Sequence, residues 1–115
     1  MSEATLTIST ESFKRVDLIT VAGRVDSNTA PQLDEVLNGL MDDGRHNLVL
    51  QLSAVDYMSS AGLRALVAAL RECKKNRGDV RLTNLSQRVK EVLDLAGLDE
   101  MFQTFDDETA AVGSF

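Results

Sequence analysis

Cysteine and histidine are nearly absent from this sequence, which contains one residue of each, Cys73 and His46. A single cysteine excludes an internal disulfide, and two such residues far apart in the chain are too few for a typical transition-metal site. We therefore predict neither a metal nor a cofactor. Cys73 continues the apolar spacing of a predicted helix, which indicates a small buried side chain.

Long apolar runs are also missing, since no stretch approaches the roughly 20 residues that a membrane-spanning helix needs. The first residues, Met1–Ala4, have neither the basic start nor the apolar segment of a secretory signal peptide. From these two absences we expect a cytoplasmic protein that does not insert directly into a membrane.

Basic residues are outnumbered, because 18 Asp and Glu against 12 Lys and Arg give a formal net charge of −6. This sign disfavours nucleic acid and anionic lipid surfaces as partners, since both carry negative phosphates. Hydrophobic residues still make up 43% of the 115 residues, which is enough for one buried core. We predict a single domain over residues 1–115.

Apolar patterns typical of strands and helices follow one another along the chain. They predict an N-terminal hairpin, with one strand around Leu6 and Ile8, a polar turn at 11–15 and a second strand at 16–22. After a loop at 23–28 they predict helices that begin near Thr29, Ser60 and Ser86, strands at 47–52 and 80–84, and a short strand and helix between Phe102 and Val112. Strands that alternate with helices pair in parallel. The predicted fold is therefore α/β: one mixed, mostly parallel sheet with an antiparallel N-terminal hairpin and helices packed against it.

Two loops in this arrangement carry short polar residues, Gly23–Asn28 and Val55–Gly62. Both should lie at the carboxyl ends of strands, where folds of this class place their working residues. The helix after the first loop begins with Thr29 and Gln32 at the spacing of a capping box.

The second loop leads into a helix, and Ser59 and Ser60 stand where that helix should begin. A helix start has unpaired backbone N–H groups and a partial positive charge. A serine there can cap the helix, or it can carry a phosphate in a favourable field. Ser59 is the better cap on physical grounds, and both uses stay open at this point.

A catalytic role for the serine pair is disfavoured. A nucleophilic serine needs a base and an oxyanion hole, and residues 58–62 do not match the G-x-S-x-G elbow. His46 precedes a strand, so it should lie across the sheet from the serines. Asp26 and Asp56 belong to no recognisable catalytic motif. We expect a protein that is not an enzyme and that works by binding a partner.

Three segments, in the order expected for the family, resemble the STAS domain of sulfate transporters and anti-sigma factor antagonists. Gly23–Asp26 followed by Thr29-Ala30 is similar to the family's G-x-(hydrophobic)-D-x-x-(T/S)-(A/S) segment. Asp56–Leu63 resembles its phosphorylation loop, and residues 84–102 resemble its third helix with the turn that follows. Together the three segments run along nearly the whole chain.

This resemblance implies a stand-alone anti-sigma factor antagonist. In such members the domain binds an anti-sigma factor that is also a serine kinase, and binding frees a sigma factor. The kinase phosphorylates a loop serine, which ends the binding, and a metal-dependent serine/threonine phosphatase reverses the modification. Ser60 matches that serine, and Ser59 is the alternative acceptor because it stands where many switching members have aspartate.

The expected partner-binding surface joins the exposed start of the second helix to the loop before the first helix. It comprises Asp26, Met58, Ser59, Ser60, Gly62 and Arg64. The resemblance implies that Asp26 lies near Ser60 and helps to shape the site. An alternative stays open, because other family members are non-catalytic subunits or scaffolds of membrane transport or signalling complexes, without phosphorylation.

Overall fold

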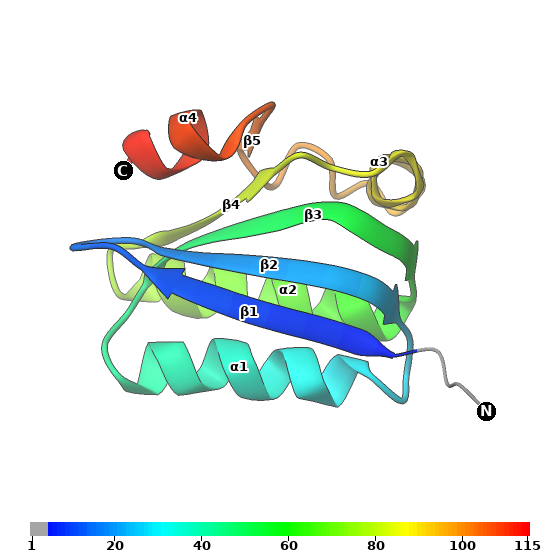
Figure 1. Cartoon of the computed structure of the whole chain (residues 1–115), viewed down its shortest axis with the longest axis horizontal. Coiled ribbons are helices and arrows are strands. Elements are labelled where there is room, and N and C mark those ends of the chain that lie inside the picture. Colours follow the sequence, from blue (N-terminus) through cyan, green and yellow to red (C-terminus); the bar gives the residue numbers. More distant parts are fainter. Residues whose placement is uncertain (1–4) are drawn as a thin grey trace.

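The computed structural model describes residues 5–115, so the prediction made for Met1–Ala4 lies outside the described residues. The elements follow the predicted order (Figure 1). They are β1 (Leu6–Ser12), β2 (Asp17–Val25), α1 (Ala30–Asp42), β3 (Asn47–Met58), α2 (Ser60–Lys75), β4 (Asp79–Thr83), α3 (Gln87–Leu95), β5 (Thr104–Phe105) and α4 (Glu108–Gly113). Over this part of the chain, no helix combines the length and the apolar character needed to cross a membrane.

One sheet contains the strands in the order β1-β2-β3-β4-β5, so each strand lies beside its neighbour in the sequence. β1 and β2 form the predicted antiparallel hairpin, whereas β2, β3, β4 and β5 pair in parallel. α1 and α2 pack together on one side of the sheet, and α4 lies on the other side near β4 and β5 (Figure 1). The prediction of a mixed, mostly parallel α/β sheet is confirmed.

The side chains of β3 show how both faces of the sheet are buried. Leu48, Leu50 and Leu52 are inaccessible to solvent and belong to the main core with α1 and α2. Val49, between them, belongs to a second cluster with Ala111 of α4. Successive side chains of a strand point to opposite faces, so covering both faces requires the nearly continuous apolar run that the sequence has here.

The strands of the hairpin are longer than the sequence predicts. Glu11 and Ser12, predicted in the turn, continue β1 because they pair with residues of β2. At the other end β2 extends through Gly23–Val25, which the sequence places in a loop. Gly23 has a φ of +113°, and a Cβ there would lie 2.2 Å from the carbonyl oxygen of Thr5. Glycine is required at this point of the pairing.

β3 also continues beyond the predicted strand and reaches Met58. The first part of the predicted loop at 55–62 is therefore strand, and the chain passes from Met58 to α2 through Ser59 alone. Pairing with β2 extends the strand as far as the contact between Val25 and Met58. Backbone pairing with a neighbouring strand overrides the polar composition of this segment.

Helix starts agree with the sequence, including that of α1 after Thr29, but the predicted cap of α1 does not. Ser86 and Asp107 cap α3 and α4 by accepting hydrogen bonds from backbone N–H groups. The capping box predicted for α1 is wrong, because the side chain of Thr29 makes no cap and that of Gln32 donates to the carbonyl of Leu6, 3.0 Å away. The Thr29 hydroxyl instead donates to the carbonyl of Arg24, at 2.7 Å. Nearby backbone groups compete successfully for both side chains.

Leu66 lies fully buried on α2, as the helical spacing predicts. We expect Leu66→Ala to lower the free energy of unfolding by about 2–5 kcal/mol, because the truncated side chain leaves a cavity in a close-packed core. Denaturant unfolding followed by circular dichroism measures this loss. Val67→Ala, at the half-buried next position, is the matched control and should cost clearly less. Equal losses in the two variants would contradict the assigned facing of α2.

Candidate functional site

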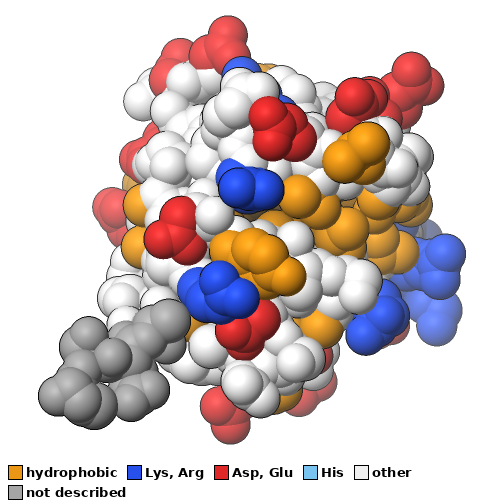
Figure 2. All heavy atoms as spheres, turned by 90° about the vertical axis from the view of Figure 1, so that its right-hand side faces the viewer, with side chains coloured by type: hydrophobic (Ala, Val, Ile, Leu, Met, Phe, Trp, Pro, Cys, Tyr) orange, Lys and Arg blue, Asp and Glu red, His pale blue; other side chains and the backbone are white. Residues whose placement is uncertain are grey.

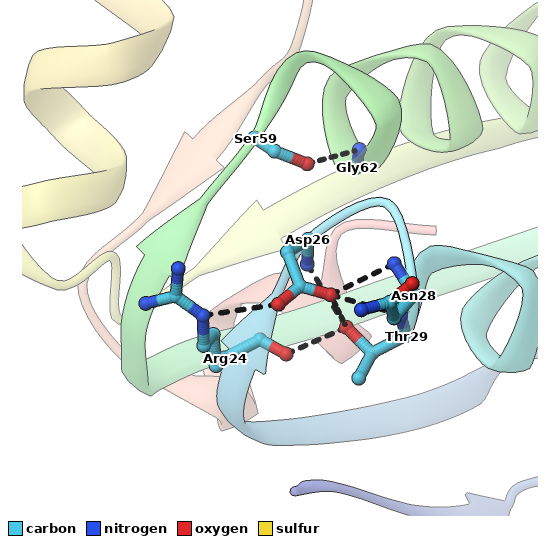
Figure 3. Close-up of polar contacts among 6 residues, drawn as sticks. All are labelled: Arg24, Asp26, Asn28, Thr29, Ser59 and Gly62. Atoms are coloured by element: carbon cyan, nitrogen blue, oxygen red, sulfur yellow. Dashed lines mark hydrogen bonds and ion pairs between the residues drawn. The ribbon is translucent and has the colours of Figure 1, made fainter. Parts of the chain in front are cut away.

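The carboxyl ends of β2 and β3 lie side by side and bring the two predicted loops together. Val25 pairs with Met58, and the backbone N–H of Ser59 donates to the carbonyl of Val25 at 2.8 Å. Asp26 follows Val25 directly, so it lies beside the residue that starts α2. Figure 3 shows the Asp26 loop and the first turn of α2 next to each other. The two predicted loops therefore lie next to each other, as expected.

The carboxylate of Asp26 holds its own loop in shape (Figure 3). Its Oδ1 accepts hydrogen bonds from the backbone N–H groups of Asn28, at 2.9 Å, and Thr29, at 3.0 Å. Its Oδ2 accepts from Nε of Arg24, also at 3.0 Å. In return, the backbone N–H of Asp26 donates to Oγ1 of Thr29 at 2.9 Å. These bonds fix the turn between β2 and α1.

The same hydrogen bonds favour the ionised form of Asp26. The backbone N–H of Thr29 is the main cause that lowers the pKa of this carboxyl below its ordinary value of 3.8, and the bonds from Asn28 and Arg24 act in the same direction. Partial desolvation opposes them without reversing the shift. At neutral pH the ionised Asp26 therefore lies beside the start of α2, paired with Arg24.

Arg24 and Tyr57 form a contact that the sequence did not indicate. The guanidinium of Arg24 lies 4.1 Å from the centre of the Tyr57 ring, within cation–π range. Arg24 is thus held both by this ring and by Asp26. Only the register between β2 and β3, which pairs Arg24 with Tyr57, brings the two side chains together.

The two adjacent serines occupy different positions. Ser59 has extended backbone angles and is the N-cap of α2, and its Oγ accepts a hydrogen bond from the N–H of Gly62 at 3.4 Å. Ser60 is the first residue of the helix and is exposed to solvent. The prediction that Ser59 caps the helix is confirmed. Ser60 is left as the accessible hydroxyl at the helix start, where the partial positive charge of the helix favours an anion.

Met58 is not part of the exposed surface, contrary to the prediction from the sequence. Its side chain is 3% exposed and packs in the main core. Gly62 is buried as well, and a Cβ there would lie 2.4 Å from Sδ of Met58 and 2.7 Å from Cγ1 of Val25. The absence of a side chain at position 62 lets α2 begin directly against the ends of β2 and β3. Both residues are therefore buried beneath the exposed surface and contribute to the site through packing.

Arg64 is exposed on α2 and lies between two open grooves. The first groove separates the starts of α1 and α2 and is lined by Ser27, Ala30, Pro31, Asp34, Ala61, Arg64, Ala65 and Ala68. The second lies between α2 and the turn after α3 and is lined by Ser60, Leu63, Arg64, Val67, Ala68, Arg71 and Leu98. Helical spacing from Ser60 finds the α2 residues of the second groove. Leu98 and the α1 residues could be found only from the tertiary structure.

Hydrophobic side chains gather on the face of the molecule that carries this end of the sheet (Figure 2). Lys and Arg side chains border them on one side (Figure 2). The second groove has the same composition, since Leu63, Val67 and Leu98 lie in it beside Arg64 and Arg71. An apolar floor with a charged rim is typical of protein-binding surfaces.

His46 directly precedes Asn47, the first residue of β3, whereas Ser60 follows the other end of that strand. The two residues are thus separated by the length of a 12-residue strand. Since His46 is the only histidine of the chain, Ser60 has no imidazole beside it to act as a base. The arrangement offers an accessible hydroxyl for modification and a surface for docking.

Comparison with known proteins agrees with this architecture. The family model described as the STAS domain matches residues 7–111. BtrV of Bordetella bronchiseptica is 33% identical over 93 residues, which are 81% of this chain and 80% of BtrV. The anti-sigma-B factor antagonist of Staphylococcus epidermidis is 32% identical over 95 residues, which are 83% of this chain and 85% of the relative. The crystal structure of an anti-sigma factor antagonist from Mycobacterium paratuberculosis superposes with a TM-score of 0.85 and 27% identity, covering 96% of this chain and 93% of that one.

We expect Gly62→Ala to destabilise the protein by about 1–3 kcal/mol, because the added methyl group overpacks the junction. The Met58 side chain can move aside, but Val25 is β-branched, buried and part of β2. Gly39→Ala is the matched control, since Gly39 lies in α1 and an added Cβ there would have nothing within 4 Å apart from its chain neighbours and the backbone of its own helix. It should leave stability unchanged or raise it by up to about 1 kcal/mol. Denaturant unfolding of both variants provides the measurement, and a Gly62→Ala protein as stable as Gly39→Ala would argue against the close contact.

The lowered pKa of Asp26 predicts a pH-dependent effect of Asp26→Asn. An ionised carboxylate favoured by the folded state adds stability above the pKa of the unfolded chain, and this stability is lost as pH falls through the lower folded pKa. The variant should be less stable than the parent at pH 7, and the difference should shrink below the ordinary carboxyl pKa of 3.8. Urea unfolding at pH 7 and pH 3 measures it. Asp56→Asn is the control, at an exposed position of β3. If Asp26→Asn is less stable than the parent by the same amount at both pH values, the lowered pKa of Asp26 is contradicted.

Proposed function

Because this chain belongs to the STAS domain family, we propose that it is an anti-sigma factor antagonist that binds an anti-sigma factor and so releases a sigma factor. The similarity to the anti-sigma-B factor antagonist over 83% of the chain supports this proposal. The partner is also a serine kinase, and both proteins act in the cytoplasm. The antagonist itself catalyses no reaction, and its activity lies in the surface that it presents.

Phosphorylation of Ser60 is the switch in this proposal, and a metal-dependent serine/threonine phosphatase resets it. The observation that carries the proposal is that the two serines have different structural roles. The Ser59 hydroxyl caps α2, whereas Ser60 is exposed on the first helical residue. A kinase can reach Ser60 without opening the cap. Ser59 is the alternative acceptor, but its modification would remove a cap that contributes to stability.

The docking surface consists of the exposed start of α2 with the neighbouring loop. Ser60 and Arg64 present their side chains there, with Ser59 between Ser60 and the Asp26 loop. Met58 and Gly62, which the sequence assigns to this surface, support it through packing. Asp26 supports it through the hydrogen bonds that hold its loop. A rigid surface loses less conformational entropy on binding than a mobile one.

A phosphate on Ser60 ends binding through its charge. It adds about 1.5 to 2 negative charges and must be desolvated when the surface is covered by a partner. It also lies on the side of the molecule that already carries the ionised Asp26. The fold tolerates the new charge, because the partial positive charge of the α2 start offsets part of it.

We expect Ser60→Asp to keep the circular dichroism spectrum and melting temperature of the parent while it weakens binding to the partner kinase by at least about tenfold. Ser60→Ala should bind as the parent does and should resist phosphorylation. Titration calorimetry against the purified kinase measures both affinities.

Kinase assays on Ser59→Ala and Ser60→Ala identify the acceptor. Phosphate retained on Ser60→Ala and lost on Ser59→Ala would reverse the assignment. If Ser60→Asp binds as tightly as the parent, the charge switch fails. A non-catalytic scaffold or transport-complex subunit, without phosphorylation, then becomes the better description. The presence of Ser59 where many switching members have aspartate keeps that alternative worth testing.

A further inference from the structure

Arg64 follows Ser60 by four residues on α2, so the two side chains lie one turn apart on the same helical face. Both are exposed and both line the groove between α2 and Leu98. An acidic group four residues before a basic one is the favourable orientation for a pair on a helix. A negative charge placed on Ser60 would therefore meet the Arg64 guanidinium.

A second arginine near this end of the sheet, Arg24, is already engaged. Arg24 pairs with Asp26 at 3.0 Å and stacks on Tyr57. Among residues 5–115 the ion pairs are made by Arg24, Arg45, Lys74 and Arg81. Within that part of the chain, Arg64 makes no ion pair that a phosphate would have to break.

We propose that a phosphate on Ser60 is held by the guanidinium of Arg64. Modification then withdraws this cation from the docking surface in addition to adding negative charge. The inference rests on the proposed phosphorylation of Ser60 and assigns the residue that responds to it. Arginine suits the role because its planar donors match phosphate oxygens in a bidentate geometry.

Other charged groups around Ser60 also act on the phosphate. Asp34 of α1 lines the groove on the far side of Arg64, and Asp26 lies in the loop before α1. Arg71 is on the same helix, seven residues beyond Arg64, and lines the same groove as Ser60. Each of these groups stays in place when Arg64 alone is changed. A comparison of variants therefore isolates the contribution of Arg64.

The experiment uses the full chain with phosphoserine introduced at position 60 during translation, so no kinase is needed. Phosphorus NMR then follows the second ionisation of the phosphate, which lies near pH 6 in an unperturbed phosphoserine. Arg64 favours the dianion, so Arg64→Gln should raise the pKa of the phosphate by about 0.2–0.4 pH units relative to the parent. Arg64→Lys should recover part of the difference, and Arg71→Gln should leave the pKa within about 0.1 pH units, because it lies beyond direct reach.

A second readout observes the arginine directly. The Nε–H signal of Arg64 should shift when the phosphate is present, whereas that of Arg71 should stay in place. Phosphoserine at position 59 is the matched control for position, because it lies five positions before Arg64 and its side chain belongs to the cap. Its titration should not respond to Arg64→Gln.

Equal phosphate pKa values in the parent and in Arg64→Gln would overturn the inference. An equal response of phosphoserine at positions 59 and 60 would also overturn it, since it would indicate a diffuse field in place of a specific pair. Either failure leaves the proposed function standing, because the phosphate was introduced artificially. The binding of Ser60→Asp tests that function separately.

Discussion

The start of α2 lies so close to the ends of β2 and β3 that position 62 has no room for a side chain. A Cβ there would come within 2.7 Å of Val25 and 2.4 Å of Met58, both of which are buried. This contact lets the first turn of α2 pack directly against the ends of the two strands. That turn begins with the exposed Ser60, so the same packing holds the start of the site in place.

The site combines polar groups that hold the structure with side chains that are exposed to solvent. Ser59 bonds to β2 through its backbone and to Gly62 through its hydroxyl, and Asp26 closes the neighbouring turn with its carboxylate. These polar groups are engaged in holding the structure, which leaves Ser60 and Arg64 exposed to solvent. In the proposed function, such a surface responds to a single added charge without refolding, because the groups that hold the fold are different from those proposed to meet the partner.

Much of the fold could be predicted because its determinants are local. The alternation and helical spacing of apolar residues, and the helix starts at Ser59 and Ser86, need only neighbours in the sequence. The errors lie where distant segments compete for the same groups. β3 continues to Met58 because β2 lies alongside it, and Thr29 leaves its predicted cap because the Arg24 carbonyl is within reach. Composition carries no information about such partners.

By itself the sequence determined an acidic α/β domain with a serine pair at a helix start, and it identified Ser59 as the better cap. Only the tertiary structure decided which predicted site residues reach solvent. Met58 follows a strand and precedes two serines, so nothing in its local pattern distinguishes burial from exposure. Its burial follows from the approach of α2 to β2, a contact between residues more than 30 positions apart in the chain. The groove beside Arg64 has the same origin, because Leu98 reaches α2 through the packing of the whole core.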